Sequence, residues 1–173
     1  MQIGYMTQEE REERREILTR RYFFPKPEEI REAYEFIGSS AKMAANIVRV
    51  PMNQFNQWEK GDKPMPYGLF ELLLLRTGQK GVRTNGVKGK ARPCVWYPPL
   101  PKEIIHARRV ANLTIEEAAD LVHVPPRFWQ QWEEGRGNMM SGLFHLFLLK
   151  TRQDALVIEG PLAREGRAMS LLG

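Results

Sequence analysis

Residues 25–79 read PKPEEIREAYEFIGSSAKMAANIVRVPMNQFNQWEKGDKPMPYGLFELLLLRTGQ. Residues 99–153 read PLPKEIIHARRVANLTIEEAADLVHVPPRFWQQWEEGRGNMMSGLFHLFLLKTRQ, and the two stretches align without a gap at an offset of 74 residues. They share 23 identities in 55 positions. Because a long internal repeat is one structural unit present twice, we expect two similar domains in this chain.

Helix-start and helix-stop residues divide each copy into four short helices. In the first copy, prolines open the first and third helices, a serine caps the second, a glycine ends the third and a proline precedes the fourth. These residues are Pro27, Ser40, Pro51, Gly61 and Pro66. Their counterparts in the second copy are Pro101, Thr114, Pro125 and Gly135, followed by the run SGLFHLFLL. The sequence therefore predicts an all-α fold with domains at 25–79 and 99–153.

Three further segments flank the copies. Residues 1–24 are expected to form a charged helical arm with a capping box at Thr7 and Glu10. This arm would either lie on the first copy or serve as a dimerising or DNA-contacting arm. The linker at 80–98 carries five basic groups and no acid, and is either a spacer or a segment that tracks DNA. The tail at 154–173 holds a short strand candidate and an apolar end that docks on a partner or closes the second core.

Composition excludes several classes of protein. With 173 residues, 42% of them hydrophobic, the chain is an ordinary globular one, and it has neither an apolar run long enough to cross a membrane nor a secretory signal. We therefore expect a cytoplasmic protein. One cysteine and three histidines without ligand spacing predict no metal, and we expect no cofactor, small-molecule ligand or enzymatic activity. The net charge of +5 points to a polyanionic partner.

The second and third helices of each copy have the packing pattern of a helix-turn-helix. Small residues allow two helices to cross closely, valines bracket a four-residue turn, and aromatic residues anchor the following helix. In the first copy these residues are Ala44, Ala45, Val48, Val50, Phe55 and Trp58. The first of the two helices would then support the second, whose polar face could enter a major groove.

On these residues, the segments SSAKMAANIVRVPMNQFNQWEKGDKPMP and LTIEEAADLVHVPPRFWQQWEEGRGNMM resemble the lambda-repressor-like (XRE-type) helix-turn-helix family. The pattern of that family is roughly LSQEELAxxLGVSxxTVSxWExGxxxP, and its Trp-Glu-x-Gly ending falls at residues 58–61 and 132–135. The resemblance covers about two thirds of the chain. It implies compact helical domains that bind DNA through the third helix and most often repress transcription.

The two copies depart from the family pattern at three places. The turn glycine is Arg49 in one copy and His123 in the other, which predicts a slightly different turn. The glutamine that often opens the second helix in that family, and braces the backbone or a base, is Ala41 in the first copy and isoleucine in the second, so we expect that contact to be missing. Proline replaces the serine cap at Pro51 and Pro125 and offers no side-chain cap.

The resemblance places candidate DNA contacts on both copies. Amides can pair with adenine and arginine with guanine, so side chains of these types on the third helix are candidate base readers. The predicted readers are Met52, Asn53, Asn56, Gln57, Arg127, Gln130 and Gln131. The predicted phosphate contacts are Lys42, Arg49, Lys60, Lys63, Lys88, Lys90, Arg92 and Arg136.

From these features we expect a sequence-specific double-stranded DNA-binding regulator, a repressor of a bacterial, plasmid or phage operon, that reads two unlike half-sites. Homodimerisation stays open. One alternative is a DNA-shaping accessory factor for recombination or partition. Another is an antitoxin-like or anti-defence module in which one copy binds a protein. Glu116, Glu117 and Asp120 of the second copy would repel phosphates if they faced the duplex.

Overall fold

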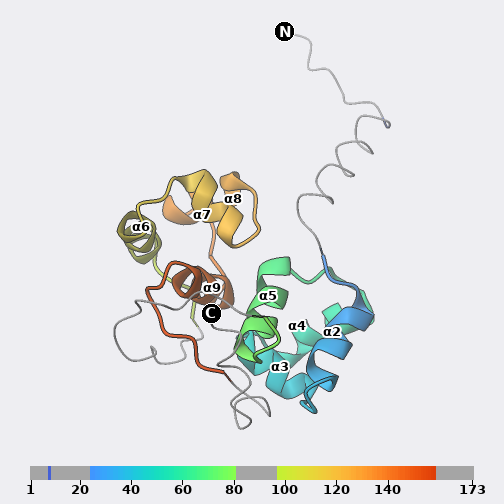
Figure 1. Ribbon diagram of the computed structural model, residues 1–173. Helices are drawn as coiled ribbons and strands as arrows, with labels where there is room; N and C mark the ends of the chain where they lie inside the picture. Colours follow the sequence, from blue (N-terminus) through green and yellow to red (C-terminus); the bar gives the residue numbers. More distant parts are fainter. Residues whose placement is uncertain (1–7, 9–23, 81–96, 159–173) are drawn as a thin grey trace.

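The computed structural model describes residues 8, 24–80 and 97–158, and this part of the chain is helical without a strand (Figure 1). The first half, residues 24–80, contains α2 (Pro27–Glu35), α3 (Ala41–Ile47), α4 (Met52–Lys60) and α5 (Tyr67–Arg76). The second half, residues 97–158, contains α6 (Pro101–Val110), α7 (Ile115–Leu121), α8 (Pro126–Glu133) and α9 (Ser141–Lys150). The all-α prediction is confirmed. The strand expected after residue 154 is absent from the described residues 155–158.

The helix ends lie where the sequence places them. The Ser40 side chain accepts a hydrogen bond from the Met43 amide at 3.3 Å, and Thr114 forms a capping box with Glu117. Pro51 and Pro125 start α4 and α8 without a side-chain cap, as predicted. Gly61 ends α4 in the left-handed conformation, with φ of 80°, which glycine adopts without a steric penalty.

The backbone conformation repeats at the same offset even where the residues differ. Arg49 and His123 have φ of 60° and 59°, and Gly38 and Asn112 have φ of 67° and 55°. Arg49 and His123 thus keep the left-handed conformation that a turn glycine favours, although such a conformation is uncommon for residues with a Cβ. The absence of a turn glycine therefore does not change the sign of φ at this position in either copy.

Each half encloses a small core beneath its two central helices. Phe55 and Trp58 pack edge to face with ring centroids 6.0 Å apart, and Trp129 and Trp132 repeat this arrangement at 6.0 Å. All four rings are buried, as the spacing predicts. The paired alanines of α3 and α7 are also fully buried, which lets each short helix approach the aromatic helix that follows it.

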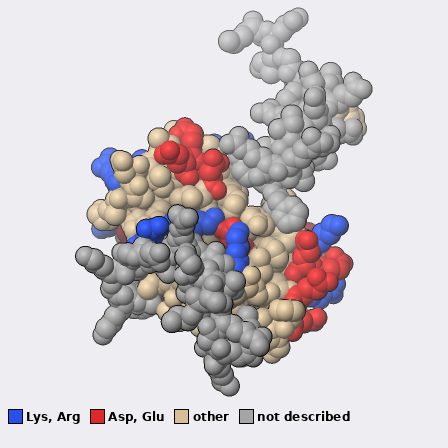
Figure 2. Space-filling model, in the orientation of Figure 1, with Lys and Arg blue, Asp and Glu red and all other residues tan. Residues whose placement is uncertain are grey.

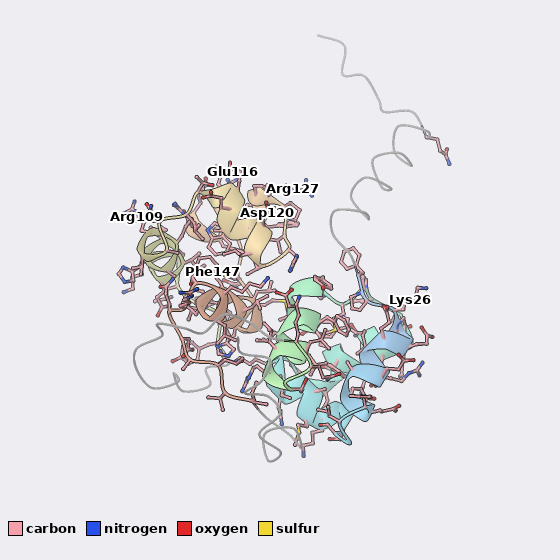
Figure 3. The ribbon with its side chains drawn as sticks, viewed as in Figure 1. Lys26, Arg109, Glu116, Asp120, Arg127 and Phe147 are labelled. Carbon is pink, nitrogen blue, oxygen red and sulfur yellow. The ribbon has the colours of Figure 1, made fainter. Side chains whose placement is uncertain are left out.

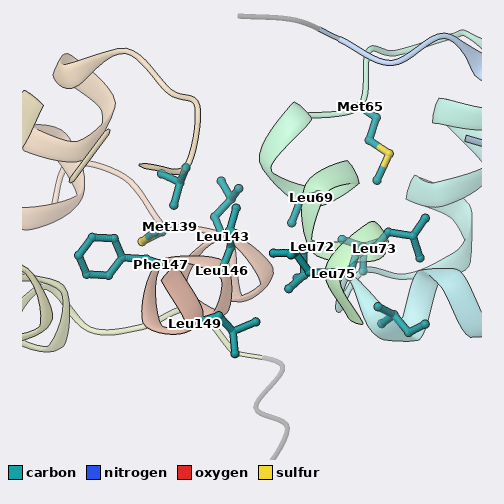
Figure 4. Close-up of a cluster of buried hydrophobic side chains, with 14 of the residues drawn as sticks. Met65, Leu69, Leu72, Leu73, Leu75, Met139, Leu143, Leu146, Phe147 and Leu149 are labelled. Carbon is teal, nitrogen blue, oxygen red and sulfur yellow. The ribbon is translucent and has the colours of Figure 1, made fainter. Parts of the chain in front are cut away.

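The two halves pack against each other through α5 and α9 (Figure 1). Leu69 and Leu72 of α5 face Leu143 and Leu146 of α9, and all four side chains are buried (Figure 4). The leucine-rich helices α5 and α9 therefore share one continuous core, which explains why neither helix has a continuous polar face.

Two glycines at equivalent positions allow this close approach. A Cβ on Gly68 would lie 2.6 Å from Leu143 Cδ2 and 2.6 Å from the carbonyl oxygen of Val122. A Cβ on Gly142 would meet Leu69 Cδ2 and the carbonyl oxygen of Val48 at the same distances. Because each contact has a counterpart with the halves exchanged, the packing has the reciprocity of a two-fold symmetric dimer, here built within one chain.

Candidate nucleic-acid interface

The predicted base readers of the first half lie on the outer face of α4. Phe55 and Trp58 fill the inner face of this nine-residue helix, and positions 52, 53, 56 and 57 lie on the opposite side. Met52 and Asn53 are exposed, whereas Asn56 and Gln57 are half-buried. The structure therefore brings the four predicted readers of this half to one helix face.

The amides on this face differ in how they are engaged. Asn53 Oδ1 accepts a hydrogen bond from the Gln54 amide at 2.9 Å, and the Asn53 side chain is exposed. Within the described ranges, the Asn56 and Gln57 side chains have no hydrogen-bond partner in the protein. Their donors and acceptors are therefore available to water or to a ligand.

Three of the four predicted phosphate contacts of the first half are exposed. Lys42 lies near the start of α3, Lys60 ends α4, and Lys63 follows it. Arg49 is placed differently: it is half-buried, and its Nη1 donates to Ser141 Oγ of the second half at 3.2 Å. The guanidinium of Arg49 is therefore part of the contact between the halves.

The turn residue of the second half makes the matching contact. His123 packs edge to face against Tyr67 of the first half, with ring centroids 4.6 Å apart. Position 67 is the counterpart of position 141, so Arg49 with Ser141 and His123 with Tyr67 are two versions of one contact. In both halves the turn between the two central helices is held by the opposite half.

The predicted readers of the second half lie on the outer face of α8 and contact their neighbours. Arg127 and Gln130 are exposed, and Gln131 is half-buried. The Arg127 guanidinium lies 5.1 Å from the centre of the Phe128 ring, and Gln130 Nε2 donates to Glu134 at 2.9 Å. Arg136, the predicted phosphate contact of this half, forms an ion pair with the same Glu134.

Acidic side chains surround this second set of readers. Glu116, Glu117, Asp120 and Glu134 are all exposed. Figure 2 shows an acidic patch over the outer end of α7, where Figure 3 places Glu116 and Asp120 on the same side of the half as Arg127. The corresponding positions of the first half are Lys42, Met43, Asn46 and Lys60. Comparison of positions 74 residues apart is the sequence signal that reveals this reversal of charge.

The acid of the Trp-Glu pair that is repeated in both copies has a structural role. Arg108 and Trp129 both donate to Glu133 Oε1, at 2.6 Å and 2.8 Å. In the first half the Tyr34 hydroxyl donates to Glu59. Burial, together with this hydrogen bond to an anion, raises the pKa of Tyr34 to about 12, so the hydroxyl remains protonated at neutral pH. Both acids therefore tie the first helix of a half to its third.

A buried ionic cluster joins the halves, and the sequence reasoning missed it. The Glu71 side chain is 2% exposed, accepts from Lys80 at 2.7 Å, lies 3.2 Å from His123 Nε2, and forms an ion pair with Lys150. Burial alone would raise the pKa of Glu71, but the hydrogen bonds from His123, Lys150 and Lys80 outweigh it and lower the pKa to about 2. The sequence feature that could have revealed the cluster is the single acid within the leucine-rich run at 69–75.

His145 occupies the counterpart position of Glu71 in α9. It is 7% exposed, and its Nδ1 lies 3.4 Å from Asp154 Oδ2. Burial, reinforced by the charges of Arg49 and Arg76, lowers the pKa of His145 to about 3, so the imidazole is neutral at pH 7. The interface between the halves is therefore symmetric in backbone and asymmetric in charge.

Several of the predicted DNA contacts and segments lie outside the described residues. The linker contacts Lys88, Lys90 and Arg92, the N-terminal arm and the tail after residue 158 belong to the part that is not described. In the described ranges, no group of three or more histidine, cysteine or acidic side chains is arranged to hold a metal ion. None of the described helices is both long and apolar enough to span a bilayer.

The two helix pairs, α3–α4 and α7–α8, thus present equivalent faces with different chemistry. One face is amide-rich and flanked by lysines, and the other combines an arginine and two amides with four acids. Comparisons with family models, with curated proteins and with solved structures find no match to this chain.

Proposed function

We propose that the protein binds double-stranded DNA sequence-specifically and regulates transcription, with α3–α4 and α7–α8 serving as helix-turn-helix units of the lambda-repressor-like type. One observation carries the proposal. In each half a short helix and a left-handed turn present a second helix whose inner face is buried aromatics and whose outer face holds amides or arginine. This is the arrangement that a recognition helix requires, because the buried side fixes its orientation and the polar side meets base edges.

The side chains of α4 suit adenine and thymine. An Asn or Gln amide can donate to adenine N7 and accept from adenine N6, and an exposed methyl group such as that of Met52 can contact the thymine methyl. The absence of protein partners for Asn56 and Gln57 in the described ranges supports this role, since no internal hydrogen bond would have to break on binding.

The packing of α5 on α9 supports a two-fold arrangement of the two proposed helix-turn-helix units within one chain. Regulators of this type commonly bind as dimers whose two-fold axis matches that of the operator. Here the two halves pack reciprocally within one chain, and their outer helices carry different residues. We therefore propose an operator without strict palindromic symmetry, and repression by its occupation, in a bacterial, plasmid or phage setting.

The test is selection of binding sites from randomised duplex DNA by the full chain, followed by binding isotherms on the selected site. We expect Asn56→Ala and Gln57→Ala each to weaken specific binding by about 1 to 3 kcal/mol while binding to unrelated DNA stays nearly constant. Asn138→Ala, an exposed amide outside α4 and α8, is the matched control. Failure of the wild-type chain to enrich any sequence at moderate salt would contradict the proposal.

One observation favours a second candidate function for part of the molecule. The acids Glu116, Glu117, Asp120 and Glu134 give the outer face of the second half a charge that suits a basic protein better than DNA. An antitoxin-like or anti-defence module would use such a face. If the wild-type chain selects no DNA, capture of a basic protein that is lost on Glu116→Lys would support this candidate.

A further inference from the structure

We infer that the two halves have unequal parts in DNA binding: the α3–α4 face of the first half holds the duplex, and the second half acts as a built-in dimer partner whose α7–α8 face stays off the phosphate backbone. This inference rests on the proposed DNA-binding function and narrows it to one site. It would reduce the two predicted half-sites to one contacted half-site.

The first step is the charge at equivalent exposed positions. Lys42 of α3 corresponds to Glu116 of α7, and Lys60 at the end of α4 corresponds to Glu134 just after α8. Lys63 corresponds to a glycine. All of these charged side chains are exposed, so the difference lies on the surface and not in the cores. The exposed pair Asp62 and Arg136 has the opposite order of charge, but Arg136 is paired with Glu134. A duplex placed on the two faces in the same way would therefore meet more lysines on the first and more carboxylates on the second.

The second step is the energy of that difference. Each lysine that neutralises a phosphate releases counterions and adds about 0.9 to the slope of log K against log salt. A carboxylate at the same place releases none and is repelled by the phosphate. Two such exchanges are enough to decide which face binds.

The third step concerns the cations of the second half. The guanidinium of Arg136 forms an ion pair with Glu134, and Gln130 donates to that same carboxylate. Arg127 lies against the Phe128 ring. DNA binding by this face would therefore have to break these contacts, whereas within the described ranges the Asn56 and Gln57 amides of the first half have no protein partner to give up.

The fourth step is the structural use of the second half. Its α9 covers the apolar face of α5, where Leu69 and Leu72 would otherwise meet water (Figure 4). It also supplies Lys150 and His123 to the buried carboxylate of Glu71. The second half thus provides what a partner subunit provides in a symmetric dimer, without a need for its own contact with DNA.

The experiment exchanges the charges of the two faces in the full chain and measures binding to the selected site over a range of salt. Lys42→Glu with Lys60→Glu should weaken binding roughly 100-fold and lower the salt slope by about 2. Glu116→Lys with Glu134→Lys should strengthen binding roughly 10-fold, raise the slope by about 2 and lengthen the footprint. The charge-matched controls are Lys102→Glu with Arg109→Glu on α6, and Glu32→Lys with Glu35→Lys on α2, all exposed.

Reader truncations complete the test. Asn53→Ala with Gln57→Ala should abolish sequence specificity. Arg127→Ala with Gln131→Ala should leave the affinity within about twofold of that of the wild type and should not change the length of the footprint. Circular dichroism and denaturation of each variant confirm that it is folded. Equal losses from the two truncations would overturn the inference and leave the proposed function standing. An unchanged footprint and affinity for the Glu116→Lys, Glu134→Lys variant would also overturn it. If the wild-type chain selects no DNA sequence, both this inference and the proposed function are contradicted.

Discussion

At the centre of the molecule, the first half places Glu71 on α5 and the second half places His145 at the equivalent position of α9. Glu71 is an anion paired with Lys80 and Lys150 and in contact with His123, whereas His145 is a neutral imidazole close to two arginines. The surrounding backbone contacts are nevertheless the same in both halves. The comparison shows that this repeat keeps its fold through contacts that tolerate a change of charge.

The shared contacts are hydrogen bonds to main-chain oxygens. Arg76 Nη1 donates to the Ile47 carbonyl at 3.0 Å, and Lys150 Nζ donates to the equivalent Leu121 carbonyl at 2.8 Å. The Gln79 and Gln153 amides donate to the carbonyls of Ala33 and Ala107, which are also equivalent. These acceptors belong to the backbone and cannot mutate, so the donors could diverge only within narrow limits, while the ionic partners were free to change.

The largest expected effect comes from removing the charge that distinguishes the halves. Glu71→Gln leaves Lys150 and His123 without their buried anion and should lower the free energy of unfolding by about 3 kcal/mol, near the lower end for a broken buried pair because Lys80 is partly exposed. His145→Gln replaces a neutral side chain by another of similar polarity and should cost less than about 1 kcal/mol at pH 7. Urea denaturation of both variants measures the difference.

A matched substitution separates charge from packing in this comparison. Glu28→Gln removes an acid from the exposed Glu28–Arg31 pair on α2 and should change stability by less than about 0.5 kcal/mol. If Glu71→Gln were no more destabilising than Glu28→Gln, the ionic cluster would contribute nothing to the junction of the halves.

The second prediction tests the reciprocity of the junction. Gly68→Ala and Gly142→Ala each introduce a Cβ 2.6 Å from a backbone oxygen and from a leucine methyl of the other half. Overpacking of this kind should cost about 2 kcal/mol in each case, after the small gain from the better helix former. Gly137→Ala, whose Cβ would lie 3.7 Å from the nearest atom, should be neutral. Unequal losses at Gly68 and Gly142 would mean that the two sides of the junction are not equivalent.

Much of the fold could be predicted from the sequence because its signals are local. Ser40, Thr114 and Gly61 specify helix ends through their own backbone and side-chain chemistry, and the aromatic spacing of α4 and α8 specifies their inner faces. The junction of the halves could not be predicted in this way. Gly68 and Gly142 act through atoms of the other half, and no local pattern distinguishes them from ordinary glycines near a helix start.

The candidate site was predictable in its residues and less so in their surroundings. The structure groups Met52, Asn53, Asn56 and Gln57 on one face, as their helical spacing implies. Arg49 shows the limit of this reasoning: its charge suggests a phosphate contact, but the left-handed turn brings its guanidinium to Ser141, a residue 92 positions away. Whether a basic side chain at a turn faces solvent depends on which element packs beside it, and that is a tertiary property.

The effect that is smallest at pH 7, and the one that isolates His145 from Glu71, is a dependence of stability on pH. The pKa of His145 is lowered from 6.5 to about 3 in the folded protein, so between these values the unfolded chain binds a proton that the folded chain does not. Stability is therefore full above pH 6.5 and should fall by about 1 kcal/mol for each pH unit below it. Glu71, with its pKa lowered from 4.5 to about 2, adds a loss only below pH 4.5.

Denaturation curves between pH 7.5 and 4.5 should thus show a pH slope of stability that the His145→Gln variant lacks. The control variant His106→Gln, which changes an exposed histidine on α6, should keep this slope. A slope that survives His145→Gln would show that another group carries the pH dependence, and that a buried neutral imidazole at position 145 is not its origin.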